Sequence, residues 1–294
     1  MRFTLFVIIG ISLYISSCKN DAKRDNVIVD SSIADTASVI VNESKWGLIK
    51  RFRFENARPY GIANFKQYLA ISDHSENRVV LFDTLDYSIL VDLDIDEPEL
   101  IKVKRSTLVV PSSSMDSIYY FKGYGVHTLS NFAPMVDPSG VDVERVDHWA
   151  FVDRGNNRVL FQNAPKGIQH IFGEEGSSEF KLNNPTNVLL LDSLICVVDS
   201  GNKRVQVYTE NGNFYSSISN SSSWINPTGI SNEEDTLYIS DPAANRIDLF
   251  TVQGEYLETI FTDLSGPTDL NYYESKLFIA NNEDSTITVL KEID

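Results

Sequence analysis

The sequence has few cysteines, few basic residues and no long hydrophobic segment. Its 294 residues include two cysteines, Cys18 and Cys196, so at most one disulfide bond is available to stabilise the fold. Lys and Arg number 25 against 41 Asp and Glu, which gives a formal net charge of −16. Because proteins bind nucleic acids through Lys and Arg that displace counterions from phosphates, no nucleic-acid partner is expected.

The longest apolar run, residues 3–15, is shorter than the roughly 20 residues that cross a bilayer, but it is typical of a signal-peptide core. It leads into Ile15-Ser-Ser-Cys18, which resembles the lipobox of bacterial lipoproteins. The resemblance implies that residues 1–17 are a signal peptide and that Cys18 is acylated. The protein would then be held on the lipid bilayer of the bacterial cell envelope, and we expect the outer membrane. The alternative is an ordinary secretory signal that ends near a cysteine.

The residues after the signal peptide divide into a tether and a body. Residues 18–45 are rich in Asp, Ser and Asn, which predicts a lipidated cysteine followed by a flexible tether. Residues 46–294 form the body. With Cys18 acylated, Cys196 has no disulfide partner, and its apolar neighbours predict a buried, inert thiol.

The body is built from a repeated unit. Its clearest part is Asp-x-x-x-x-Arg followed by a hydrophobic run, at residues 73–78, 153–158, 199–204 and 241–246, with a worn copy at 281–286. A proline precedes each copy. The interval between Pro59 and Pro138 is twice the usual spacing, and Pro98 within it indicates a further unit. Each unit of about 40 residues predicts four short strands, the pattern of a propeller blade. Six units predict an all-β fold, a six-bladed β-propeller.

The two ends of the body complement each other. The last unit supplies only three strands before the chain stops, whereas the segment Trp46–Phe54 precedes the first proline as an extra strand. If that segment completes the last blade, no open sheet edge is left between the first and last units. The sequence therefore predicts a ring closed by an N-terminal strand.

The units resemble NHL repeats, whose propellers usually have six blades. The likeness is clearest in Phe172-Gly-x-x-Gly176 with Pro185 downstream, and it departs at Pro111 and Glu179, which replace an expected Asp and Gly. Together with the lipobox, the chain resembles the six-bladed propeller lipoproteins of bacterial envelopes. That resemblance implies little established chemistry.

The repeated Asp and Arg residues predict structural roles, because one residue type at the same place in every blade meets the same local need. Departures from the repeat are more informative. Tyr60 and Glu99 directly follow the prolines of the first and second units. Asn187 and Asp269 lie two positions after the prolines of the fourth and sixth units, where other units have glycine. These four residues are the candidate binding site, at the mouth of the central channel. The alternative is a solvated channel without a function.

Two enzyme families bear on whether this site holds a metal. The amidating lyases with NHL architecture resemble this chain, but their zinc-binding histidines have no counterpart here, because no His follows a proline. His74, His127, His148 and His170 are expected in turns and outer strands. Calcium-dependent sugar lactonases resemble the ring more loosely, and that likeness implies Glu99, Asn187 and Asp269 as possible oxygen ligands for calcium.

The sequence contains no Gly-x-Ser-x-Gly, no His-Glu-x-x-His and no phosphate-binding Gly-rich loop, so no catalytic residues are assigned. We therefore expect a membrane-anchored lipoprotein without enzymatic activity or cofactor, whose propeller binds an envelope protein or a small ligand. The alternative is a channel-centred hydrolase or lyase of the lactonase-like kind that depends on a divalent cation such as calcium.

Overall fold

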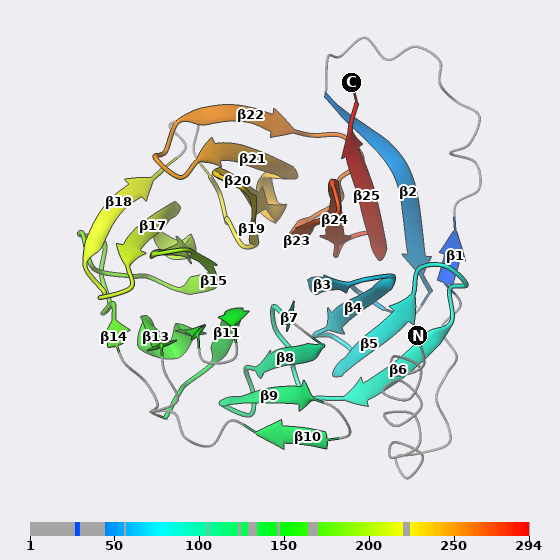
Figure 1. The fold of residues 1–294 in the computed structure, drawn as a ribbon, viewed down its shortest axis with the longest axis horizontal. Coiled ribbons are helices and arrows are strands. Elements are labelled where there is room, and N and C mark those ends of the chain that lie inside the picture. The colour runs from blue at the N-terminus through cyan, green and yellow to red at the C-terminus, as the bar shows by residue number, and fades with distance from the viewer. Residues whose placement is uncertain are drawn as a thin grey trace.

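Six small antiparallel sheets surround a common axis in the computed structural model of the protein, which confirms the six-bladed β-propeller (Figure 1). The structure describes residues 27–29, 45–55, 57–104, 106–122, 125–128, 134–145, 148–163, 170–219 and 224–293. The expected signal peptide and Cys18 lie outside these residues. Within them, no helix is long and apolar enough to cross a membrane.

The strands of the first three blades follow one another from the axis outwards. Blade 1 consists of β3 (Gly61–Phe65), β4 (Tyr68–Asp73), β5 (Arg78–Asp83) and β6 (Ile89–Asp94). Blade 2 consists of β7 (Lys102–Lys104), β8 (Thr107–Ser112), β9 (Ser117–Lys122) and β10 (Gly125–Thr128). Blade 3 consists of β11 (Pro138–Arg145), β12 (His148–Asp153), β13 (Arg158–Asn163) and β14 (His170–Phe172).

Blades 4 and 5 repeat this order. Blade 4 consists of β15 (Pro185–Leu191), β16 (Leu194–Asp199), β17 (Arg204–Thr209) and β18 (Phe214–Ile218). Blade 5 consists of β19 (Ile230–Glu233), β20 (Thr236–Asp241), β21 (Arg246–Thr251) and β22 (Tyr256–Ile260).

Blade 6 joins the two ends of the body, as the sequence predicts. It contains β23 (Pro267–Tyr273), β24 (Lys276–Asn281) and β25 (Thr286–Glu292), followed outwards by β2 (Trp46–Phe54). β2 pairs with β25 from Trp46 opposite Glu292 to Arg53 opposite Thr286, with a β-bulge between Leu48 and Lys50.

A fifth strand lies outside β2 on blade 6. Residues Val27–Val29, which fall within the expected tether, form β1 and pair antiparallel with the end of β2 (Figure 1). Part of the segment before the body is therefore attached to the rim of the propeller.

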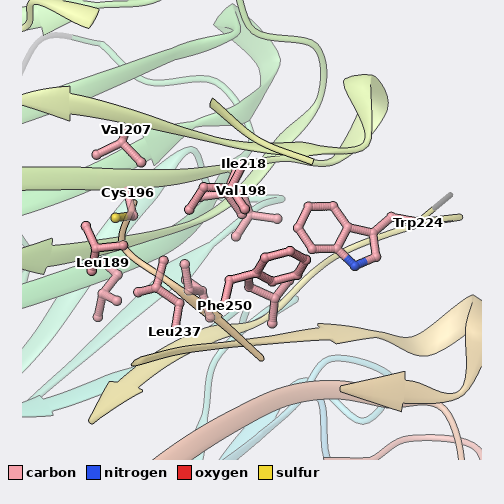
Figure 2. Close-up of a cluster of buried hydrophobic side chains, with 12 residues drawn as sticks. Leu189, Cys196, Val198, Val207, Ile218, Trp224, Leu237 and Phe250 are labelled. Atoms are coloured by element: carbon pink, nitrogen blue, oxygen red, sulfur yellow. The ribbon is translucent and has the colours of Figure 1, made fainter. Parts of the chain in front are cut away.

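The hydrophobic core lies between neighbouring blades. Figure 2 shows one such layer, in which Leu189, Cys196 and Val198 of blade 4 face Leu237 and Phe250 of blade 5. Strands with alternating β-branched and aromatic residues form this layer because each sheet must cover one face with its neighbour. Cys196 is fully buried and free, which confirms that part of the prediction, and burial raises the pKa of its thiol to about 12.

The repeated Asp ends the second strand of a blade and fixes the segment before the first strand. Asp241 accepts hydrogen bonds from the N–H groups of Ile225 and Asn226, and from that of Ala244 in the next turn. The turn in blades 3, 4 and 5 is one turn of 3₁₀ helix: η3 (Arg154–Asn156), η4 (Ser200–Asn202) and η5 (Pro242–Ala244).

The repeated Arg holds the same segment from the third strand. Arg204 contacts the Asp199 carboxylate at 2.8 Å and donates hydrogen bonds to the carbonyls of Ser178 and Lys181. In blade 2 the register places Ser112, opposite Ser117, at the Asp position. The prediction that Pro111 replaces that Asp was therefore wrong by one residue, and the spacing of 14 positions from proline to Asp in blades 1, 4 and 5, counted from Pro98, also gives Ser112.

Candidate functional site

The candidate site lies on the face of the ring where the inner strands begin, which we call the proline face. The turns after the repeated Asp residues lie on the same face, because the second strand of each blade returns to it. The residue after the proline is Ser139, Thr186 or Thr268 in three blades, and each hydroxyl donates to a backbone carbonyl of the following blade. Tyr60 and Glu99 occupy this position in blades 1 and 2, so they too are placed to reach the next blade.

Glu99 reaches a guanidinium of blade 3. Its carboxylate oxygen Oε1 accepts a hydrogen bond from Nη2 of Arg154 at 2.8 Å, and the Glu99 side chain is 2% exposed. Arg154 also donates to both oxygens of Asp137, from Nε at 2.7 Å and from Nη2 at 2.6 Å. Two carboxylates thus share one guanidinium. Charge-assisted bonds of this bidentate kind are among the strongest and most directional in proteins.

Two rings of blade 1 border the Glu99 carboxylate. Nδ1 of His74 lies 3.6 Å from Oε1 of Glu99, and the His74 side chain is 40% exposed. The Tyr60 ring lies beside the imidazole, with the two ring centroids 5.6 Å apart. Tyr60, His74, Glu99, Asp137 and Arg154 therefore form one contiguous group, which we call the Glu99 cluster.

Burial and the charges within the cluster together shift the pKa values of three of its members. It raises the pKa of Glu99, while the charge of Arg154 and the hydrogen bond from it oppose the rise. Burial and then the negative charge of Glu99 raise the pKa of the Tyr60 phenol. Burial acts to lower the pKa of Arg154, but its bonds to Asp137 and Glu99 outweigh burial and raise it. Arg154 therefore remains a cation, and Tyr60 remains a neutral hydrogen-bond donor.

Asp269 lies on the inner strand of blade 6 and has different partners. One of its oxygens accepts a hydrogen bond from the N–H of Ile62 in blade 1 at 2.9 Å. Burial raises its pKa to about 7, while the bonds from the N–H groups of Ile62 and Leu270 and the charge of Lys102 act against the rise. Its charge also reaches Tyr60, although no direct bond joins the two side chains.

Asn187 lies apart from the Glu99 cluster. Its Oδ1 accepts a hydrogen bond from the N–H of Val188, within its own strand. The glycines of the preceding blades make room for these polar residues: a Cβ at Gly140 would lie 2.9 Å from Oδ1 of Asn187, and a Cβ at Gly229 would lie 2.8 Å from Oδ1 of Asp269. The glycine in one blade therefore leaves the space that the polar side chain of the next blade occupies.

A second charged pair occupies the inner strands further from the proline face. Nζ of Lys102 in β7 lies 3.0 Å from Oδ1 of Asp142 in β11, and Oδ2 of Asp142 accepts a hydrogen bond from the N–H of Leu190 in β15. The pair links blades 2, 3 and 4. Its polar atoms are occupied by one another and by the backbone, which indicates a role in holding the inner strands together.

The structure thus brings together two of the four residues predicted to form the site. Tyr60 and Glu99 join one cluster, Asp269 acts on it only through its charge, and Asn187 does not take part. His74, Asp137 and Arg154 were not predicted as members of the site. A signal for two of them was present, because His74 and Arg154 directly follow the repeated Asp73 and Asp153, where blades 4 to 6 have Ser200, Pro242 and Asn282.

Among the residues that the structure describes, no three His, Cys, Asp or Glu side chains are grouped as metal ligands. Glu99, Asn187 and Asp269 are each engaged by a different partner. The expected placement of the histidines is wrong for His148, which begins β12 and is buried between two carboxylates, with Nδ1 2.7 Å from Glu144 and Nε2 2.8 Å from Glu210.

Comparisons with known proteins show likeness in fold. No family model matches the chain, and no curated protein matches it either. The resemblance to NHL repeats and to envelope lipoproteins therefore stays a prediction.

Solved structures do match. A streptogramin B lyase superposes with a TM-score of 0.64 at 14% identity, over 84% of this chain and 97% of its own. Virginiamycin B lyase from Staphylococcus aureus superposes with a TM-score of 0.63 at 16% identity, over 84% of this chain and 100% of its own. Its catalytically inactive histidine-to-alanine variant with quinupristin is equally similar. A chain of a nidogen–laminin complex superposes with a TM-score of 0.58 at 16% identity, over 72% of this chain and 89% of its own.

Proposed function

We propose that the protein is a lipoprotein of the bacterial cell envelope, anchored by acylated Cys18, whose propeller binds a basic segment of another envelope protein on the proline face. The observation that supports this proposal is the Glu99 cluster. It brings Glu99, which departs from the blade repeat, together with His74, Asp137 and Arg154 in a network of polar contacts.

The charge of the cluster favours a cationic ligand. Glu99 and Asp137 carry two negative charges against the one positive charge of Arg154, and the whole chain has a formal net charge of −16. The side chains of Asp137 and His74 are each 40% exposed, so a ligand can reach them. A Lys or Arg side chain would find a carboxylate there, and beside it the Tyr60 ring, which attracts cations.

Capture from gently solubilised membranes tests this proposal, with the full lipidated chain as bait. Asp137→Ala and His74→Ala should each reduce recovery of the partner that wild type retains. Glu274→Ala, on the opposite face, should not. Recovery should also fall as salt is raised, because exposed charges are screened over about 8 Å at physiological ionic strength. Equal recovery with all four proteins would contradict binding at the Glu99 cluster.

A second candidate function is a hydrolase or lyase. The observation that favours it is the pair His74 and Glu99, because Nδ1 of His74 is buried, lacks a hydrogen-bond partner and faces a carboxylate. A carboxylate beside an exposed imidazole is an arrangement used in general base catalysis. The lyases among the similar structures share only the fold with this chain. Their chemistry would have to be tested separately in this protein.

The predicted calcium dependence of this second candidate has a direct measurement. A divalent ion that binds only the folded protein raises the melting temperature by mass action. If calcium is bound through Asp269, millimolar calcium should stabilise wild type and leave Asp269→Ala unchanged. No shift in wild type would remove the calcium-dependent enzyme from consideration.

A further inference from the structure

The strand β1 determines where the N-terminal segment leaves the propeller. β2 runs towards the proline face, because the N–H of Phe54 donates to the carbonyl of Ser285 in a turn on that face, and the chain then enters blade 1. β1 is antiparallel to β2, with Val27 opposite Phe54 and Val29 opposite Phe52. The N-terminal end of β1 therefore lies beside the end of β2 that leads to the proline face. β1 forms the outer rim of blade 6 (Figure 1).

Few residues separate this point from Cys18. Val27 is nine positions after Cys18 in the sequence, a span that covers at most about 30 Å when fully extended. As a flexible chain it would average roughly 17 Å. The opposite face of the ring lies one strand further, about 20 Å for a six-residue strand such as β24. The short connection therefore favours an anchor on the proline-face side.

We propose that β1 turns the proline face towards the bilayer, so that the Glu99 cluster takes its ligand from the membrane surface. This inference rests on the proposed function, because it requires an acylated Cys18. The ligand is then a basic segment next to the membrane-spanning part of an envelope protein.

Charge accounts for this choice of ligand. An acidic protein with a net charge of −16 is repelled by anionic headgroups when it lies directly against them. Basic segments beside a membrane are attracted to those same headgroups. A basic segment between the propeller and the bilayer therefore satisfies the carboxylates of the Glu99 cluster on one side and the lipid phosphates on the other.

Two probe positions on blade 6 test the orientation. Glu283 lies in the turn after β24 on the proline face, Glu274 lies in the turn before β24 on the opposite face, and both are exposed. Glu283→Cys and Glu274→Cys can each be labelled with a fluorophore. Cys196 stays unlabelled because it is buried and its thiol pKa is raised to about 12.

The labelled, lipidated chains are reconstituted in vesicles of phosphatidylethanolamine and phosphatidylglycerol that contain a headgroup nitroxide. Quenching falls with distance, and one strand height of about 20 Å separates the two probes, so the probe at residue 283 should be quenched about twofold more. Equal quenching, or stronger quenching at residue 274, would overturn the orientation.

Flotation with the vesicles separates the two proposals. A wild type that floats, with a Cys18→Ser variant that does not, supports the anchor. If wild type does not float, both the anchor and the orientation fail, whereas a floating protein with equal quenching at the two probes overturns the orientation alone.

A last variant tests β1 itself. Val27→Gly, Ile28→Ser and Val29→Gly together keep the length of the segment but weaken its strand pairing. The variant should still float, and the difference in quenching between the two probes should disappear. An unchanged difference would show that β1 does not orient the propeller and would overturn the inference.

Discussion

Glu99 shows how a single residue can depart from a repeat without destabilising the fold. Its side chain is 2% exposed, so as an unpaired carboxylate it would carry a large desolvation cost. Arg154 compensates that cost from the neighbouring blade and is itself oriented by Asp137. The buried carboxylate therefore depends on a residue 55 positions away in sequence.

Arg154→Met should therefore be strongly destabilising. Removing one partner of a buried ion pair typically costs about 3–5 kcal/mol, because the other charge stays buried without compensation. The double variant Glu99→Gln with Arg154→Met should recover a large part of that loss. Urea unfolding at pH 7 measures both free energies. Equal losses in the single and double variants would mean that the pair is not coupled as the distances indicate.

Asp269 should make stability depend on pH. Its pKa is raised from 3.8 to about 7 by burial, so between these values the folded protein keeps a proton that the unfolded chain releases. The contribution of Asp269 to the free energy of unfolding thus falls as pH rises from about 4 to 7, by roughly 4 kcal/mol in total. Asp269→Asn should flatten this fall in a series of urea unfolding curves. If the free energies of unfolding of wild type and Asp269→Asn changed in parallel with pH, the raised pKa of Asp269 would be contradicted.

At the scale of strands, β2 is the element that closes the ring. Trp46, Phe52 and Phe54 are 4%, 1% and 3% exposed and pack against blades 5, 6 and 1. Thr286–Glu292 would become a bare edge without β2. The closure therefore rests on both hydrophobic burial and backbone pairing.

Deleting residues 46–54 should abolish cooperative folding, since the loss would exceed the 5–15 kcal/mol that typically separates folded from unfolded proteins. Appending the same nine residues after Ile293 through an Asn-Gly turn should restore it, because β2 is antiparallel to β25 and begins beside the C-terminus. Thermal melting followed by circular dichroism compares the two. If the deletion melts like wild type, or if the appended strand gives no rescue, the closure mechanism is wrong.

The same elements show how far sequence patterns predict this fold. Blade number and the bounds of β2 followed from the repeat, because turn residues and strand alternation are local signals. The Asp position of blade 2 was misassigned to Pro111, although the 14-position spacing from the proline gives Ser112, the residue that strand pairing also gives. The partners of Glu99 were missed because contacts between blades depend on how neighbouring sheets meet. The pairing of β1 was missed because a three-residue apolar segment carries no periodicity.

At the scale of the whole molecule, the two faces of the ring differ. The proline face carries the Glu99 cluster and the end of β1 that leads back to Cys18. On the opposite face the first and second strands of blades 1, 4, 5 and 6 are joined by short turns, such as the one that contains Lys66. If the protein binds a partner through the Glu99 cluster, contact with that partner must be confined to one face.

Site-directed photo-crosslinking in living cells tests this most directly. A photoreactive residue replaces Glu76, exposed in the turn beside His74, or Lys66, exposed at the other end of the same blade. Binding at the Glu99 cluster should give a crosslinked species from position 76 that disappears with Asp137→Ala, and none from position 66. Crosslinking from position 66 alone, or from both positions regardless of Asp137, would contradict a binding site at the Glu99 cluster.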